Sequence, residues 1–136
     1  MDSNVITITG DISNSTTGSE GRGIYLHQSG ENGGNTITVT GDISTVKESL
    51  LYNGSNTNKN TSVYTGNISS STKEAVYFNQ SDSNTTTITG NITSSASTGI
   101  RFYNGANSNT TTVTGNITAS EGLQINDCLL YTSPSP

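Results

Sequence analysis

Hydrophobic and polar residues alternate along most of this chain in short runs, such as Thr36-Ile37-Thr38-Val39-Thr40. A period of two is typical of β-strands with one buried face, and the chain carries no stripe of helical period. Between the runs stand Gly, Asn and Ser, which tolerate positive φ or hydrogen-bond to their own backbone and so favour turns. The pattern predicts an all-β chain of short strands and turns.

The runs belong to a repeat. The string Thr-Gly-(Asp or Asn)-Ile-(Ser or Thr) occurs five times, with its glycine at positions 10, 41, 66, 90 and 115, and an Asn stands six residues before each glycine. We divide the chain into units 4–34, 35–59, 60–83, 84–108 and 109–127, a period of about 25 residues. The first unit has six extra residues, which we expect in a loop around 16–22 or 30–34.

Aligned units produce columns that are apolar in every copy. The first column holds Ile8, Val39, Tyr64, Ile88 and Val113; the second holds Ile12, Ile43, Ile68, Ile92 and Ile117; the third pairs Ile24, Leu50, Val76, Ile100 and Leu123 with Leu26, Tyr52, Phe78, Phe102 and Ile125. One unit is too small to bury a core, but stacked units bury a continuous one. The sequence predicts a right-handed parallel β-helix, or β-solenoid, of about five coils spaced roughly 4.8 Å apart. The handedness is inferred from a period that is not a multiple of six.

Composition excludes several function classes. Hydrophobic residues make up 28% of the chain and charged residues 11%, with a net charge of −5 and a pI near 4.5. The five basic residues are scattered singly, so we expect no nucleic-acid partner, which would require a basic patch. No run approaches the roughly 18 to 20 apolar residues of a membrane-spanning helix.

The last nine residues, 128–136, differ from the repeat and contain the only Cys and both Pro. This string resembles a translated sequencing-library adapter, as expected of a metagenomic fragment, so we restrict the repeat domain to 1–127. On this interpretation the natural chain continues past the fifth unit. It then has, as far as it is seen, no cysteine for disulfides or for Cys-based sites.

The unit Asn-Thr-x-Thr-x-Thr-Gly-(Asp or Asn)-Ile-(Ser or Thr), followed by a strand such as Gly23-Ile24-Tyr25-Leu26, resembles the passenger repeats of bacterial autotransporters and related surface adhesins over residues 4–127. The resemblance implies a β-helix displayed outside a Gram-negative cell after export through a C-terminal β-barrel, and a role as adhesin, stalk or scaffold. It implies an extracellular location, membrane attachment only through the missing barrel, and host cells, glycans or further copies as partners. Open strand edges at both ends also predict self-association.

Two outward surfaces are candidate binding sites. The first is an uncharged array that flanks the first inward column and consists of Thr7, Thr9, Thr38, Thr40, Thr65, Thr87, Thr89, Thr112 and Thr114. It resembles the Thr-x-Thr face of ice-binding solenoids, which is the alternative function. The second is an aromatic strip of Tyr25, Leu51, Tyr77 and Arg101, continued by Gln124, that we expect to contact glycans or partner proteins.

The sequence contains no pattern of residues that is typical of an active site. Asp11 and Asp42 align in neighbouring coils, and we interpret them as solvated turn caps, with a weak calcium site as the alternative. His27 is the only histidine and has no Ser or Cys partner at a repeated position. Carbohydrate-active β-helix enzymes need clustered carboxylates with Arg or Lys, and no such cluster is visible. We expect no catalytic residue, no metal and no cofactor, and keep a carbohydrate-active enzyme as the least favoured alternative.

Overall fold

The computed structural model describes residues 3–27, 34–54 and 59–126, and these residues form only strands, turns and loops. The strands are β1 (Val5–Thr9), β2 (Ile12–Asn14), β3 (Ile24–His27), β4 (Thr36–Thr40), β5 (Ile43–Thr45), β6 (Leu50–Asn53), β7 (Thr61–Thr65), β8 (Ile68–Ser70), β9 (Val76–Asn79), β10 (Thr85–Thr89), β11 (Ile92–Tyr103), β12 (Thr110–Thr114) and β13 (Ile117–Ile125). The predicted all-β class is confirmed.

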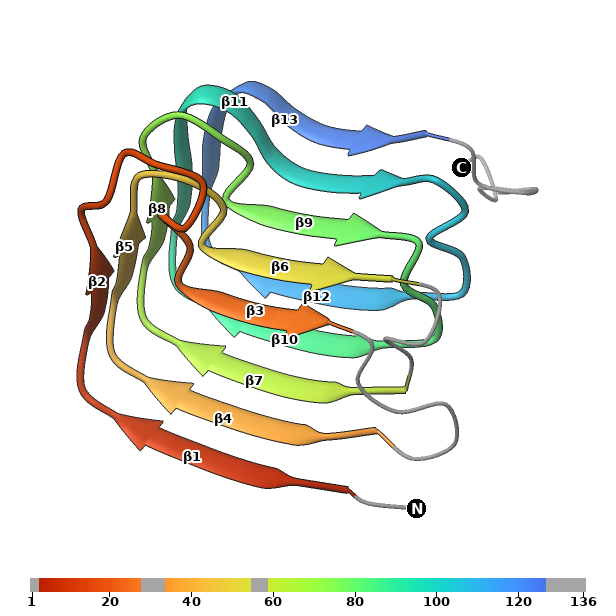
Figure 1. Ribbon diagram of the computed structural model, residues 1–136. Helices are drawn as coiled ribbons and strands as arrows, with labels where there is room; N and C mark the ends of the chain where they lie inside the picture. Colours follow the sequence, from red (N-terminus) through yellow and green to blue (C-terminus); the bar gives the residue numbers. More distant parts are fainter. Residues whose placement is uncertain (1–2, 28–33, 55–58, 127–136) are drawn as a thin grey trace.

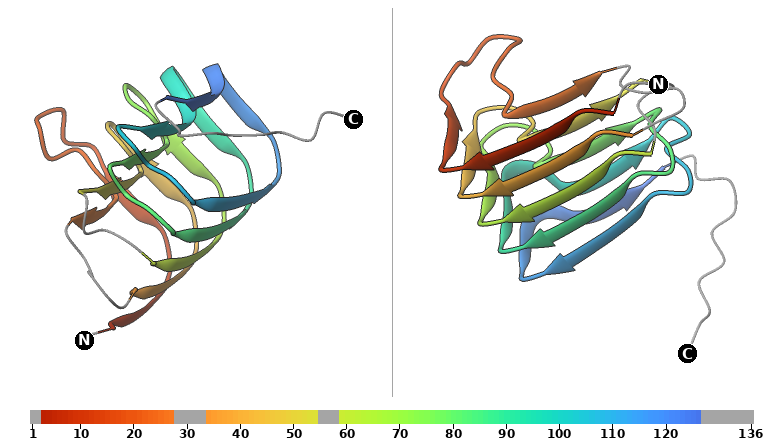
Figure 2. Two further views of the ribbon diagram at one scale, coloured as in Figure 1. Left: turned by 90° about the vertical axis from the view of Figure 1, so that its right-hand side faces the viewer. Right: turned by 90° about the horizontal axis from the view of Figure 1, so that it is seen from below.

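The strands wind into a parallel β-solenoid. We call each turn of the coil a rung: β1–β3, β4–β6, β7–β9, β10–β11 and β12–β13 form rungs 1 to 5 (Figure 1). One parallel sheet has the order β1-β4-β7-β10-β12, and a second, bent sheet contains β2, β5 and β8 on one side and β3, β6 and β9 on the other, joined through β11. In Figure 1 the chain runs clockwise from β1 to β3, and the side view in Figure 2 shows that later rungs recede from the viewer. The coil is right-handed, as predicted.

The predicted register is also confirmed. Ile8 pairs with Val39, Ile12 with Ile43 and Ile24 with Leu50, and the same pairing continues through later rungs. Stacking places each inward column on itself, so the side chains of the predicted inward columns are buried in rungs 2 to 4, apart from Phe102 of rung 4, which is partly buried. The first and last rungs have a described neighbour on one side only, and their inward residues are therefore partly buried or exposed.

One inward column was not anticipated. It precedes the first predicted column and changes from apolar to polar along the axis: Ile6, Ile37, Ser62, Thr86 and Thr111. Large aromatic rings occupy the third inward column over the same part of the rod. The rings of Tyr52, Phe78 and Phe102 stack in successive rungs, with centroids 4.5 and 4.8 Å apart. The Tyr52 hydroxyl bonds to Ser62 at 2.8 Å and to the Tyr64 hydroxyl at 2.9 Å, which satisfies both phenols inside the core.

Two ladders of Asn and Asp side chains connect the rungs. In the inner ladder, the backbone N–H and Nδ2 of Asn35 donate to Oδ1 of Asn60, and those of Asn60 donate to Oδ1 of Asn84. In the corner ladder, the backbone N–H of Asn67 donates to Oδ1 of Asp42 in the preceding rung. The inner ladder is buried and the corner ladder is exposed, and buried amides of this kind are tolerated because they are hydrogen-bonded.

The glycine of each repeat stands where the chain turns from the first sheet into the second. Gly66 has φ of +142°, and a Cβ atom there would overlap the carbonyl oxygen of Gly41 in the preceding rung. Both the positive φ and this close approach of two backbones require glycine at the corner.

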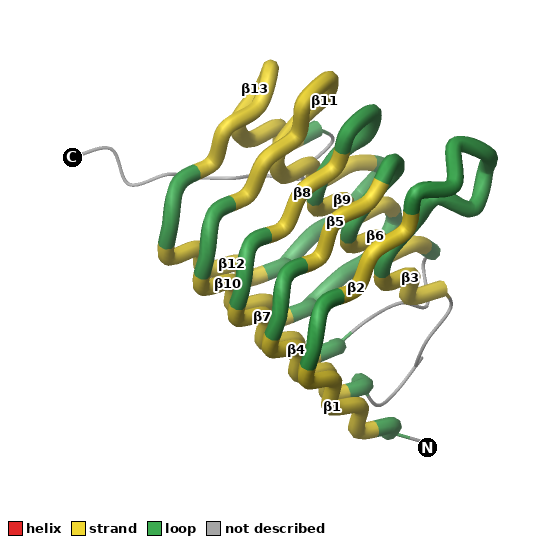
Figure 3. Tube along the Cα trace, turned by 90° about the vertical axis from the view of Figure 1, so that its left-hand side faces the viewer, coloured by secondary structure: helices red, strands yellow, loops and turns green. Residues whose placement is uncertain are grey.

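The extra residues of the first unit lie partly between β2 and β3. Residues 15–23 form this connection, whereas 46–49 and 71–75 make it in rungs 2 and 3, and the longer loop projects from the first rung (Figure 3). Nδ2 of Asn14 closes the base of the loop by donating to the carbonyl oxygens of Glu20 and Arg22, both at 2.9 Å. The alternative position, 30–34, lies largely outside the described residues.

The buried phenols predict a loss of stability at alkaline pH. Burial raises the pKa of Tyr52 from its ordinary value of 10.0, and burial together with the neighbouring Tyr52 raises the pKa of Tyr64 well above it. Since the folded state holds both phenols neutral, this stabilisation is complete below about pH 10 and is lost as the pH rises through the folded-state pKa values. Urea unfolding between about pH 8 and about pH 11 should show a smaller loss for Tyr64→Phe than for the wild type. Tyr25→Phe, at an exposed position, is the control, and equal losses in wild type and Tyr64→Phe would contradict the prediction.

Candidate functional site

The predicted threonine array is wider than expected. Its residues point outward from the first sheet in register, with Thr7 beside Thr38 and Thr9 beside Thr40. A third file, formed by Thr36, Thr61, Thr85 and Thr110, lies alongside the two predicted files. Val5 and Val63 are the only other residues on this surface, which we call the threonine face. The sequence signal for the third file was the Thr that follows the ladder Asn in four units.

Regular spacing makes the threonine face a lattice of hydroxyl and methyl groups. Neighbouring threonines on one strand are about 6.7 Å apart, and those on adjacent strands about 4.8 Å apart. No charged side chain interrupts the face among the described strands of this sheet. The arrangement offers an ordered, uncharged surface rather than a pocket.

The predicted aromatic strip lies on the opposite part of the coil, where β3, β6, β9 and β11 align Tyr25, Leu51, Tyr77 and Arg101 in one row. Tyr25 is 43% exposed, but Leu51 is only 5% exposed. Leu51 lies between Tyr25 and Tyr77 of the adjacent rungs. The prediction that Leu51 is a contact residue is therefore corrected, because its side chain is buried. A second row adds Tyr103, whose ring centroid lies 6.5 Å from that of Tyr77. We call Tyr25, Tyr77 and Tyr103 the tyrosine face.

Two ion pairs flank the tyrosine face. Nε of Arg22 lies 3.3 Å from Oε2 of Glu48, and Nη1 of Arg101 lies 2.9 Å from Oε1 of Glu74, with both carboxylates nearly buried. The Arg22 guanidinium also stacks on Tyr25 at 5.0 Å, and that of Arg101 lies 4.5 Å from the centre of Tyr103. Each arginine is thereby neutralised by a carboxylate and fixed against an aromatic ring.

Amide side chains order the edge of the same face. Nδ2 of Asn104 donates to Oδ1 of Asn79, and Nδ2 of Asn79 donates to Oδ1 of Asn53. Nδ2 of Asn53 in turn donates to the Tyr25 hydroxyl at 3.1 Å. Burial raises the pKa of Tyr77, and the nearby Arg101 partly offsets this effect. The tyrosine face is therefore a surface whose side chains are held in place before any ligand arrives.

The corner that holds Asp11 and Asp42 serves the backbone. Oδ1 of Asp11 accepts the N–H of Asp42 at 2.8 Å, and Oδ1 of Asp42 accepts the N–H of Asn67 at 2.7 Å. Both aspartates are exposed, as their interpretation as turn caps requires. His27 is also exposed, and its Nδ1 lies 3.2 Å from the Tyr25 hydroxyl. Among the described residues, no group of three or more His, Cys, Asp and Glu is placed to hold a metal ion.

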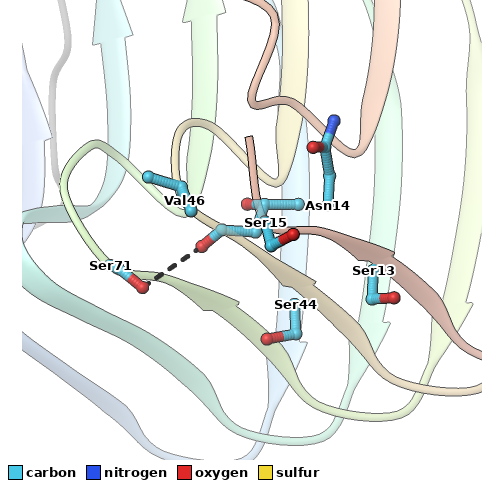
Figure 4. Close-up of a pocket in the computed structure, with 7 residues that line it drawn as sticks. Ser13, Asn14, Ser15, Ser44, Val46 and Ser71 are labelled. Atoms are coloured by element: carbon cyan, nitrogen blue, oxygen red, sulfur yellow. Dashed lines mark hydrogen bonds between the residues drawn. The ribbon is translucent and has the colours of Figure 1, made fainter. Parts of the chain in front are cut away.

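A shallow groove of about 280 Å³ lies at the corner after β2 and β5 and is lined by Ser13, Asn14, Ser15, Ser44, Thr45, Val46 and Ser71 (Figure 4). Several of its polar groups serve the fold: the Asn14 amide holds the long loop, and the Ser71 hydroxyl donates to the Thr45 carbonyl oxygen at 3.4 Å. The lining contains no acid or base, so the groove does not combine a nucleophile with a proton acceptor.

Comparison of the chain with protein-family models, curated proteins and solved structures found no match. Within the described part of the chain, no helix has the length and apolarity needed to cross a membrane.

The corner ladder predicts that Asp42 is replaceable by its amide. Asn67 and Asn91 accept the same hydrogen bond in later rungs, so Asp42→Asn should change the free energy of unfolding by less than about 0.5 kcal/mol. Asp42→Leu removes the acceptor and should cost about 1 kcal/mol. Calorimetric titration with Ca²⁺ should give the same featureless trace for wild type and Asp42→Asn. A saturable signal that only the wild type shows would reopen the calcium interpretation.

Proposed function

We propose that this chain is a rod segment of an extracellular bacterial adhesin of the autotransporter kind, with a structural and adhesive role and no catalytic one. The observation that supports it best is a repetitive solenoid that gathers exposed Tyr25 and half-buried Tyr77 and Tyr103 on one face. The resemblance of the repeat unit to passenger repeats supports display outside the cell. Each added rung lengthens the rod and contacts only its neighbouring rungs. This architecture suits a stalk that carries contact residues away from a surface.

The tyrosine face favours an uncharged glycan as the contact partner. Tyrosine rings offer apolar area at low entropic cost, which matches the C–H face of a sugar ring. The amides of Asn53, Asn79 and Asn104 add donors and acceptors that suit sugar hydroxyls. Because Arg22 and Arg101 are paired with Glu48 and Glu74, no net positive charge remains to favour an acidic polymer.

The adhesive proposal predicts that removal of two rings weakens contact. Tyr25→Ser combined with Tyr77→Ser should lower binding to cultured epithelial cells and to an array of neutral glycans by about tenfold or more, since each aromatic contact contributes about 0.5 to 1.5 kcal/mol. The matched control is Thr87→Ser with Thr112→Ser on the opposite face, which should bind like the wild type. Unchanged binding in the tyrosine variant would exclude this face as the contact site.

The threonine face supports a second candidate function, ice binding. The specific observation is the third threonine file, which makes the array three threonines wide in rungs 2, 4 and 5, while Val5 and Val63 interrupt it in rungs 1 and 3. A flat lattice of hydroxyls and methyls at fixed spacing presents a repeating surface to ordered water. This face and the tyrosine face are separate surfaces, so the two functions are tested independently.

Ice binding predicts thermal hysteresis with faceted ice crystals in dilute solutions of the protein. Thr87→Tyr, in the middle file, should abolish the hysteresis by raising a bulky ring above the lattice. Ser44→Tyr, on an exposed outward position of β5, is the matched control and should retain it. Absence of hysteresis in the wild type at millimolar concentration would end this candidate.

A further inference from the structure

The tyrosine face is narrow across the strands and long along the rod. The strands β3, β6, β9 and β11 each contribute two outward residues to this side of the coil, so the surface consists of two files about 6.7 Å apart. Along the rod, Tyr25 in rung 1 and Tyr103 in rung 4 are separated by three intervals of about 4.8 Å, or roughly 14 Å. These spacings are set by the strand register and do not depend on the ends of the rod. A ligand that uses the whole surface therefore lies parallel to the rod axis.

Aromatic rings recur in the first file on alternate rungs. Tyr25 in rung 1 and Tyr77 in rung 3 occupy the same position in register, about 9.6 Å apart along the axis, and the smaller, buried Leu51 lies between them. Tyr25 is 43% exposed and Tyr77 is half-buried, so both rings keep surface that a ligand can reach. The file thus presents an apolar contact, a gap and a second apolar contact, in steps of one rung.

The second file carries hydrogen-bonding groups that follow the same direction. Asn53 and Asn79 lie in register, and Asn104 extends the row of amides into rung 4. Within this row Asn79 donates once, to Asn53, and accepts once, from Asn104. Because an amide has two N–H donors and an oxygen with two lone pairs, such a row can hold its own order and still bond to the hydroxyl groups of a ligand.

An unbranched chain of β-1,4-linked neutral sugars has a matching repeat. Equatorial bonds on both sides of each ring keep the chain straight, and each sugar lengthens it by nearly the rung spacing of about 4.8 Å. Successive rings are rotated by half a turn, so the same ring face recurs at every second sugar, as the tyrosines of the first file recur at every second rung. An α-1,4-linked chain curves and leaves a straight row after few sugars.

We propose that the tyrosine face binds an unbranched β-1,4-linked neutral glycan that lies along the rod axis, with one sugar to each rung. Tyr25 and Tyr77 contact alternate sugar rings, and Tyr103 contacts the sugar at rung 4 from the second file. The amides of Asn53 and Asn79 bond to hydroxyl groups along one side of the chain. This inference rests on the proposed adhesive function and names the class of glycan that the same face takes.

The first test compares oligosaccharides of equal length by titration calorimetry of the full chain. Cellotetraose, which is β-1,4-linked, should bind at least about tenfold more tightly than maltotetraose, which contains the same sugar in α-1,4 linkage. The affinity for β-1,4-linked glucose oligomers should rise from two sugars to about four, because one sugar fits each rung from Tyr25 to Tyr103. Chitotetraose has the β-1,4 linkage with N-acetylglucosamine. Preference for either β-linked tetraose over maltotetraose supports the inference, and the tighter of the two identifies the sugar.

The second test removes one ring at a time. Tyr77→Ser should lower the affinity for the preferred tetraose about two- to tenfold, since one aromatic contact is lost. Tyr103→Ser should remove the gain in affinity between three sugars and four. Ser44→Ala, at an exposed outward position of β5, is the control and should bind like the wild type. Circular dichroism checks that each variant is folded, and the comparison of linkages in the wild type needs no variant.

The outcomes separate this inference from the proposed function. If maltotetraose binds as tightly as both β-linked tetraoses, or if affinity does not rise with length, the axial β-1,4-linked chain is excluded while contact with neutral glycans stands. If no oligosaccharide binds at millimolar concentration, yet Tyr25→Ser with Tyr77→Ser still abolishes binding to cells, the inference is wrong and the tyrosine face contacts a protein. If the wild type binds neither cells nor oligosaccharides, the inference and the adhesive function both fail.

Discussion

In-register stacking of near-identical rungs is the constraint on which this structure depends. Because each residue lies about 4.8 Å from its equivalent in the next rung, every side chain must be compatible with a copy of itself. Apolar residues, threonines and amides meet this condition, since isoleucines pack on isoleucines and an amide donates to the amide beside it. Charged residues do not, which accounts for a chain in which only 11% of residues are charged.

Departures from strict repetition occur where a neighbour compensates for them. Glu48 and Glu74 stand at equivalent positions in adjacent rungs, and each is matched by an arginine from the rung on its outer side. Tyr52 and Tyr64 bring two hydroxyls into an apolar core, and a serine replaces isoleucine beside them. The same principle applies to the tyrosine face, where amides and arginine–carboxylate pairs connect adjacent rungs and each arginine also lies against a tyrosine of its own rung.

The repeat made the fold and much of the candidate surfaces predictable from the sequence. Identical strings align Thr7 with Thr38 and Ile12 with Ile43 without any knowledge of tertiary contacts, so strand type, register and inward columns followed from the alignment. The features that the alignment did not predict depend on residues that occur in one rung only. The burial of Leu51 comes from the size of the tyrosines on either side, and the contact of Arg101 with Glu74 requires a long side chain to reach back across a rung. Pattern analysis averages over the copies, so it sees what they share and misses what distinguishes them.

The opposite polarity of the two side-chain ladders has an electrostatic consequence. In the inner ladder the side-chain carbonyls point toward the preceding rung, and in the corner ladder they point toward the following one. In rungs 3 to 5, where both ladders hold amides, the side-chain dipoles along the rod axis are therefore opposed, whereas the corner acceptors of rungs 1 and 2 are the carboxylates of Asp11 and Asp42. A stack of amides that all pointed one way would build a dipole that grows with every rung, as the peptide units of a helix do. With two opposed ladders, a solenoid of this kind gains length without an electrical penalty that rises with it.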